Sequence, residues 1–284
     1  MRSDILLLLV LLLVAGASAF GYYRYRRRAA WRLYHRMLES ALADGTLTPE
    51  EVAELEQFRR EREVTEGEAR MVARAVYRGA LRSAAQDARL SEEEDRHLAR
   101  LQADLGLSEN DLGEDRDTLG RLRLLAKVEA GQLPVVEAPM PLVPHEVCHW
   151  ASPASLAERL DLPGRSRTGA RGHAIPLSGT GVLPAGRQSD PLRPSEEILP
   201  VDIGLLMITS RRTVFQGAKR SVSVPHARLE TLVLHADGMR LDELGAATRA
   251  VLLVEDAELT AAILLGAARR RREEIRPTRR DRTA

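Results

Sequence analysis

The sequence predicts a multi-domain α+β protein: a single N-terminal transmembrane helix, then an all-α helical bundle, then an antiparallel β-barrel capped by a C-terminal helix. Residues 5–23 contain no charged side chain. Residues 29–131 place apolar side chains three and four positions apart, which is typical of helices. After a proline-rich stretch at 132–144 the pattern changes to the two-residue period of strands. With 284 residues the chain is long enough for two ordinary domains.

The segment 5–23 has the length and the flanking residues of a membrane anchor. As a helix it would extend ~28 Å, close to the hydrocarbon thickness of a bilayer. A cluster of arginines follows it directly, whereas only Arg2 and Asp4 precede it. The cluster consists of Arg24, Arg26, Arg27 and Arg28. Because positively charged flanks stay in the cytoplasm, we expect a single-pass protein of the cell membrane, with its N-terminus outside and its C-terminal domains cytoplasmic.

A cleaved signal peptide is the alternative interpretation of this segment. Ala17-Ser18-Ala19 offers small side chains at the spacing of a cleavage site. A signal peptide, however, carries its positive charge before the apolar run, and here the arginines come after it. The sequence therefore favours an uncleaved anchor with an arginine-rich flank over residues 1–28.

Residues 29–131 contain repeated helix-start signals. Thr48, Thr65 and Ser91 each stand three residues before a glutamate, which is the capping-box pattern. Pro49 follows Thr48 at the first helical position, where proline is favoured. The apolar spacing extends these starts into a small bundle. We expect five helices, near 29–43, 48–62, 65–86, 91–105 and 108–130.

An internal repeat places acidic residues in two similar turns of this bundle. The segment from Asp44 to Glu51 recurs as the segment from Asp87 to Glu94. An EF-hand needs carboxylates at the third and fifth loop positions, where the first turn has threonines, so an EF-hand is excluded. The simplest interpretation is that the aspartates close turns while the glutamates cap helices.

The pattern Ala43-Asp44-Gly45-x-Leu47-Thr48-x-x-Glu51, together with the second turn, resembles the tellurite-resistance TerB-like domains over about residues 30–130. In that family, acidic residues near these turns are thought to hold divalent metal. The matching residues here are Asp44, Glu51, Asp87 and Glu94. The second turn departs from the pattern, since Ala88 stands where the first has Gly45. The resemblance implies an alternative function as a divalent-metal or metal-stress sensor; no other cofactor is suggested.

The prolines of residues 132–144 predict a stiff, extended linker and a domain boundary. The segment that follows, 145–275, shows the alternation of short strands and then, from residue 256, helical spacing again. Many short antiparallel strands followed by one helix are typical of a small barrel. The candidate strands are 145–150, 171–177, 203–209, 212–217, 220–225, 229–236, 238–243 and 249–254.

Residues 204–217 read GLLMITSRRTVFQG and are followed by the basic turn Lys219-Arg220, by Pro225 and by the hairpin signal Ala236-Asp237-Gly238. This series is similar to the GRAM/PH-like signature. The resemblance implies a PH-superfold barrel over about 145–275 that docks membranes or proteins and performs no reaction. Only the basic turns carry over as candidate residues for binding anionic lipid or a partner. They are Arg211, Arg212, Lys219 and Arg220.

Several catalytic and metal-binding motifs fail on inspection. In His145–His149, strand alternation would point the two histidines one way and Cys148 the other, so they do not converge on zinc. Gly179-Thr180-Gly181 lacks the lysine of a phosphate-binding loop. Ser178 lacks the glycine two residues before it that a nucleophile elbow needs. We therefore predict no enzyme, although an active site assembled from scattered residues would escape a motif search.

Charge and composition complete the prediction. Lys plus Arg (42) nearly cancels Asp plus Glu (41), and the net charge of +1 argues against a nucleic-acid binder. Residues 276–284 are a basic tail that we expect to be disordered. The arginine-rich composition is associated with GC-rich bacterial genomes. The sequence thus predicts a membrane-anchored, non-enzymatic interaction or scaffold protein whose partner is an anionic lipid or another protein.

Overall fold

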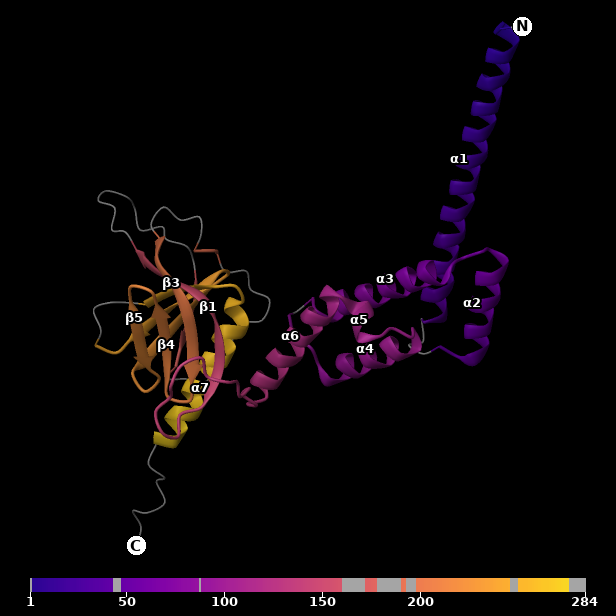
Figure 1. Ribbon diagram of the computed structural model, residues 1–284. Helices are drawn as coiled ribbons and strands as arrows, with labels where there is room; N and C mark the ends of the chain where they lie inside the picture. The colour runs from indigo at the N-terminus through magenta and orange to yellow at the C-terminus, as the bar shows by residue number, and fades with distance from the viewer. Residues whose placement is uncertain are drawn as a thin grey trace. The chain divides into compact units, whose positions relative to one another are not determined.

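The computed structural model describes residues 2–42, 47–86, 88–159, 172–177, 190–192, 198–245 and 250–275. The chain divides into two compact units (Figure 1). Residues 1–86 and 90–120 form the helical unit, and residues 87–89 and 121–284 form the β unit. The division falls inside a helix, between Gly120 and Arg121.

The helical unit is built from helices whose starts the sequence predicts. Thr48, Thr65 and Ser91 cap the second, third and fourth helices through complete capping boxes, as expected. The fifth predicted helix is broken in two at Gly113, whose φ of 54° favours glycine. The unit contains α1 (Arg2–Ala41), α2 (Pro49–Glu61), α3 (Glu66–Ala84), α4 (Glu92–Asp104), α5 (Glu109–Leu112) and the start of α6 (Glu114–Glu129).

Arginines on α3 make a ladder of ion pairs that sequence reasoning missed. Arg74 Nη2 lies 2.6 Å from Asp111 Oδ1, and Arg78 Nε lies 2.9 Å from Asp115 Oδ2. Both arginines and both aspartates are four residues apart, so each pair repeats after about one helical turn. Hydrogen bonds from the Ser108 side chain and from Arg74 lower the pKa of Asp111. The ladder fastens α3 to α5 and α6 along the surface of the helical unit.

The prediction of a transmembrane helix at the N-terminus is wrong. In the part of the chain that the structure describes, no helix is both long enough and apolar enough to cross a membrane. α1 runs without interruption from Arg2 to Ala41, and from residue 13 its side chains mix apolar residues with many arginines. This finding contradicts the predicted single-pass topology. It also contradicts the cell-membrane location and the orientation that were predicted from that topology.

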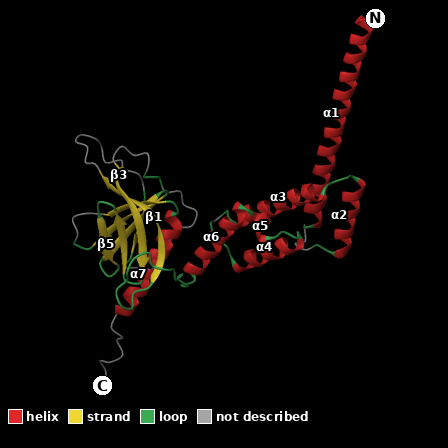
Figure 2. Cartoon of the chain, in the orientation of Figure 1, coloured by secondary structure: helices red, strands yellow, loops and turns green. Residues whose placement is uncertain are grey.

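The β unit contains one antiparallel sheet and one long helix (Figures 1 and 2). Its strands are β1 (Cys148–Arg159), β2 (His173–Pro176), β3 (Ile198–Thr209), β4 (Arg212–Gly217), β5 (Ser221–Pro225), β6 (Leu229–His235), β7 (Gly238–Glu243) and β8 (Ala250–Val254), and its helix is α7 (Ala257–Ile275). Their order in the sheet is β2-β6-β7-β8-β1-β3-β4-β5.

The sheet is not closed, so the predicted barrel is also wrong. In the described chain β2 and β5 lie at its two ends and do not pair with each other. The reason is visible in the register: β2, which lies between β1 and β3 in the sequence, pairs with β6 from His173↔Leu234 to Pro176↔Thr231. The outer edge of β6 is therefore occupied, and β5 is left as an edge strand.

The core of the β unit lies between the inner face of the sheet and α7. Alternate strand residues such as Leu206, Ile208 and Phe215 point into it. On α7, small residues including Ala261 and Ala268 are fully covered, which brings the helix close to the sheet. Leu125 and Val128 of α6 also pack into this core. The helix expected after residue 256 thus covers one face of the sheet.

Residues 136–142 cover part of the opposite face. Val136, Ala138, Met140 and Leu142 pack on Cys148, Met207 and Val214. The Val136 N–H donates to the Cys148 carbonyl at 3.0 Å. His149 Nδ1 lies 2.7 Å from the Pro134 carbonyl oxygen. The proline-rich stretch is therefore held on the sheet by hydrogen bonds as well as by apolar contact.

Candidate functional site: the β5 edge and its cavity

The β5 edge is formed by alternating serine and valine residues. Ser221 and Ser223 are exposed, whereas Val222 and Val224 point toward the core on the inner face. Pro225 ends the strand and has no N–H to donate. The Ser-Val-Ser-Val sequence thus places polar side chains on the exposed face of β5 and apolar side chains on the face toward the core.

The backbone groups of β5 are paired with β4 at every second residue only. The Gly217 N–H donates to the Arg220 carbonyl and the His226 N–H donates to the Arg211 carbonyl, both at 2.9 Å. Antiparallel ladders alternate between bonded and non-bonded pairs, and the register between these two bonds assigns Val222 and Val224 to the bonded pairs. Ser221 and Ser223 therefore direct their N–H and C=O groups away from β4, along the free edge.

A cavity of about 290 Å³ lies beside this edge. It is bounded by residues of four strands, β1, β5, β7 and β8. Its floor is apolar and its rim is polar. The floor consists of Leu156, Ala157, Val222, Val224, Leu241 and Ala250, and the rim consists of Glu158, Arg220, Ser221 and Glu243.

The charged side chains of the rim are already paired. Arg220 forms an ion pair with Glu158, and both side chains are half exposed. The Glu243 carboxylate accepts from Arg228 Nε at 3.0 Å. Two carboxylates and one guanidinium border the cavity, so its opening offers no excess of positive charge for an anion.

Asp202 holds the β4–β5 turn in place next to the cavity. Its carboxylate accepts the backbone N–H groups of Lys219 at 2.8 Å and Arg220 at 2.7 Å. Burial opposes its ionisation, but these hydrogen bonds outweigh burial and lower the pKa of Asp202. A side chain at Gly217 would collide with the Asp202 carboxylate, which explains the glycine there.

The structure separates the four basic residues that the sequence singled out. Arg211 and Arg212 lie at the start of β4, and Lys219 and Arg220 lie beyond its end. Six residues of extended chain separate the two groups by ~20 Å. Two of the four are also engaged, Arg212 with Glu146 and Arg220 with Glu158. Only Arg220 borders the cavity.

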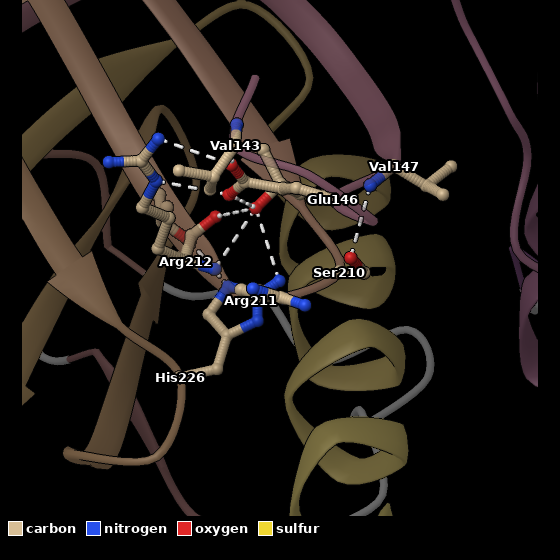
Figure 3. A network of polar contacts seen from close by, with 9 residues as sticks. Val143, Glu146, Val147, Ser210, Arg211, Arg212 and His226 are labelled. Carbon is tan, nitrogen blue, oxygen red and sulfur yellow. Dashed lines mark hydrogen bonds and ion pairs between the residues drawn. The ribbon is translucent and has the colours of Figure 1, made fainter.

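Arg212 belongs to a buried network centred on Glu146 (Figure 3). The Glu146 side chain is 0% exposed. It accepts from Arg212 Nε at 3.0 Å, from Thr209 Oγ1 at 2.6 Å and from the Val143 N–H at 3.1 Å. Burial raises the pKa of Glu146, but these donors outweigh burial and lower it. A carboxylate held in this way ties the β3–β4 turn to the residues before β1.

Three histidines of the β unit are buried and held neutral. His226 is fully buried with Nε2 3.0 Å from Thr213 Oγ1, and burial lowers its pKa to about 3. Burial likewise lowers the pKa of His149 and of His235. Because burial disfavours the charged form, these imidazoles take up protons only at a cost in free energy.

The four candidate metal residues are only partly described. Asp44 and Asp87 lie outside the described residues. Glu51 Oε2 accepts from the Thr48 N–H, and Glu94 Oε2 accepts from the Ser91 N–H, each at 2.9 Å. Both glutamates therefore cap helices. In the described ranges no group of three or more His, Cys, Asp or Glu side chains could hold a metal ion.

Comparison with protein-family models gave no match, and comparison with curated proteins gave none either. The TerB-like and GRAM/PH-like resemblances stay predictions. The site that the geometry itself offers is the open β5 edge with its cavity.

Proposed function

We propose that the protein is a non-enzymatic interaction protein whose β unit binds a partner protein at the cavity beside β5. The observation that carries the proposal is an apolar cavity of about 290 Å³ that opens next to β5, a strand with one unpaired edge among the described residues. Apolar cavities with a few polar groups at their rim are the usual form of binding sites.

The buried reactive groups favour a structural role over catalysis. The lone pairs of Glu146 and Asp202 are taken by hydrogen bonds from their own unit. Burial raises the pKa of the Cys148 thiol, which is the opposite of what activates a cysteine nucleophile. None of these three residues borders the cavity.

The charge of the rim favours a protein over a phosphorylated lipid headgroup. Headgroup phosphates need several converging cations. At the cavity, Arg220 is paired with Glu158, and Glu243 adds a second carboxylate. The remaining basic turn, at Arg211 and Arg212, lies at the other end of β4. A mostly uncharged peptide segment suits this rim better than a polyanion.

The experiment asks whether a larger side chain in the cavity prevents peptide binding. A phage-displayed library of random nonapeptides is selected on the full chain, and the selected peptides are measured by fluorescence anisotropy. We expect Ala250→Leu, which places a larger side chain in the cavity, to weaken binding at least tenfold. Ala236→Leu, an identical change at an exposed turn at the other end of β7, should leave affinity within twofold.

Three outcomes contradict the proposal. One is that no peptide is enriched over an unfolded control chain. Another is that vesicles of anionic phospholipid bind the chain while the peptides do not, which would assign the surface to lipid headgroups. Equal affinities of the peptides for Ala250→Leu and for the unchanged chain would place the peptide site away from the cavity.

A further inference from the structure

We infer that the partner binds as an added β-strand: an extended peptide that pairs with β5 through its backbone and places one apolar side chain in the cavity. This inference rests on the proposed function, because it describes how the partner occupies the same site. Addition of a strand to a sheet edge takes affinity from main-chain hydrogen bonds and specificity from pockets for alternate side chains. The β5 edge has both features.

The backbone of β5 supplies the hydrogen bonds. Ser221 and Ser223 each direct one N–H and one C=O along the free edge, as the register with β4 requires. Residues two apart in a strand are separated by ~6.8 Å. An extended peptide presents its own N–H and C=O groups at the same repeat, so it can pair with both serines without bending.

The pleat of the sheet then directs one peptide side chain inward. Peptide residues that pair with Ser221 and Ser223 would share their exposed face. The residue between them lies opposite Val222 and points to the inner face, where Val222 and Val224 line the cavity. The preferred peptide therefore carries one apolar residue, and the identity of the residue on either side of it should have little effect on affinity.

The size of the cavity agrees with a single side chain. Pockets that enclose whole drug-sized ligands have volumes of ~300–1,000 Å³. The cavity, at about 290 Å³, falls just below this range. It therefore has room for one large apolar side chain entering from the edge.

The edge also lacks the protection that isolated sheets usually carry. Proteins block exposed edges with charged side chains, prolines or bulges. β5 has a proline at its last position, but its middle, Ser221–Ser223, carries only small polar and apolar side chains and has no register shift against β4. The unprotected stretch is short, which suits a reversible peptide contact rather than a permanent interface.

The experiment compares two substitutions at one residue. Ser223→Pro removes the edge N–H without removing a bond to β4, because that N–H faces away from β4. Ser223→Ala keeps the backbone and removes only the hydroxyl group. With peptides selected on the unchanged chain, we expect Ser223→Pro to weaken binding at least tenfold and Ser223→Ala to change it less than twofold.

A change in the peptide provides a second test that does not depend on whether the Ser223→Pro variant folds. Methylating the backbone nitrogen of the peptide residue that pairs with Ser223 should abolish binding to the unchanged chain. Methylating the next residue, whose N–H faces away from β5, should not. Sensitivity at both positions or at neither would overturn strand addition.

The remaining outcomes separate the inference from the proposed function. If Ala250→Leu abolishes binding while Ser223→Pro does not, the cavity binds a peptide without strand pairing, and only the inference fails. If no peptide binds, the proposed function fails first. A concentration-dependent dimer that Ser223→Pro dissolves would assign the edge to a second copy of the chain and overturn the peptide inference.

Discussion

The helical unit and the β unit place their charged groups differently. In the helical unit, Arg74 and Arg78 reach across the surface to Asp111 and Asp115, and both arginines stay over 40% exposed. In the β unit, the Glu146 side chain is completely buried and holds Arg212 and Thr209. The arginines of these pairs are in contact with water, so salt screens the pairs, whereas the buried carboxylate of Glu146 depends on its hydrogen-bond donors.

Salt and the loss of a buried acceptor should therefore affect the stability of the two units differently. Surface ion pairs contribute little because water solvates both partners in either state. Removing one member of a buried network leaves desolvated partners unpaired, which costs much more. Each unit also contains one tryptophan, Trp31 in the helical unit and Trp150 in the β unit. Single-tryptophan variants of the full chain therefore report on the two units separately.

The largest effect is expected from Glu146. In a Trp31→Phe background, Glu146→Ala should lower the free energy of unfolding of the β unit by about 3 kcal/mol, because Thr209 and the Val143 N–H lose a buried acceptor. Urea unfolding followed by Trp150 fluorescence measures it. Glu158→Ala, which removes the half-exposed partner of Arg220, is the control and should cost less than about 1 kcal/mol.

Acid should destabilise the β unit before the helical unit. Burial holds the pKa of His226, His149 and His235 below 6.5 in the folded state, while the unfolded chain protonates them near 6.5. The stabilisation is complete above pH 6.5 and is lost as the pH falls from there toward about 3. Each histidine contributes a slope of up to ~1.4 kcal/mol per pH unit.

Unfolding at a series of pH values between 7 and 5 tests this expectation. Trp150 should report a falling stability and Trp31 a flat one. In the His226→Gln variant, the dependence of the β unit's unfolding free energy on pH should be smaller by the contribution of one histidine. A steeper slope at Trp31 than at Trp150 would contradict the contrast between the two units.

The capping boxes should have a smaller effect, and one that metal does not change. Thr48→Ala and Ser91→Ala each remove a cap and should cost the helical unit about 1 kcal/mol. The measurement is urea unfolding followed by Trp31, with calcium or with a chelator. A chelator that lowers stability, or heat released when the full chain is titrated with calcium or zinc, would instead support the metal-sensor alternative.

The smallest effect is expected for the arginine ladder. Arg74→Ala should slightly destabilise the helical unit at low ionic strength, and added salt should remove the difference, because the Arg74 side chain is 42% exposed to solvent. Arg240→Ala, which breaks a similar surface pair with Asp242, is the matched change in the β unit. Thermal melts at two salt concentrations decide it. A loss that persists in 1 M salt would show that the ladder acts by packing.

Local signals predicted much of the secondary structure. The capping boxes placed the starts of α2, α3 and α4, and strand alternation placed β4 to β8 to within a few residues. β1 extends further than expected because Pro153 and its small neighbours do not show the alternation of a strand, and β3 also begins earlier than expected, at Ile198. Helix starts and two-residue alternation depend on residues close in the sequence, which is why they could be found.

The errors concern the features that depend on distant parts of the chain. Closing the sheet depends on which strand takes the edge of β6, and no pattern in His173–Pro176 indicates that pairing. Glu146 meets Thr209 across 63 residues of sequence, so its role was invisible. The basic turns were found, but their separation by the length of β4 follows from the structure alone. The cavity likewise needs four strands to assemble it.

Amide hydrogen exchange of β5 shows directly whether a bound peptide pairs with this strand. In the free chain, the Val222 and Val224 amides are bonded to β4 and should exchange slowly, while the Ser221 and Ser223 amides should exchange fast. On adding a selected peptide, we expect Ser221 and Ser223 to become protected. Unchanged exchange at these two amides while the peptide is bound would rule out strand addition at β5.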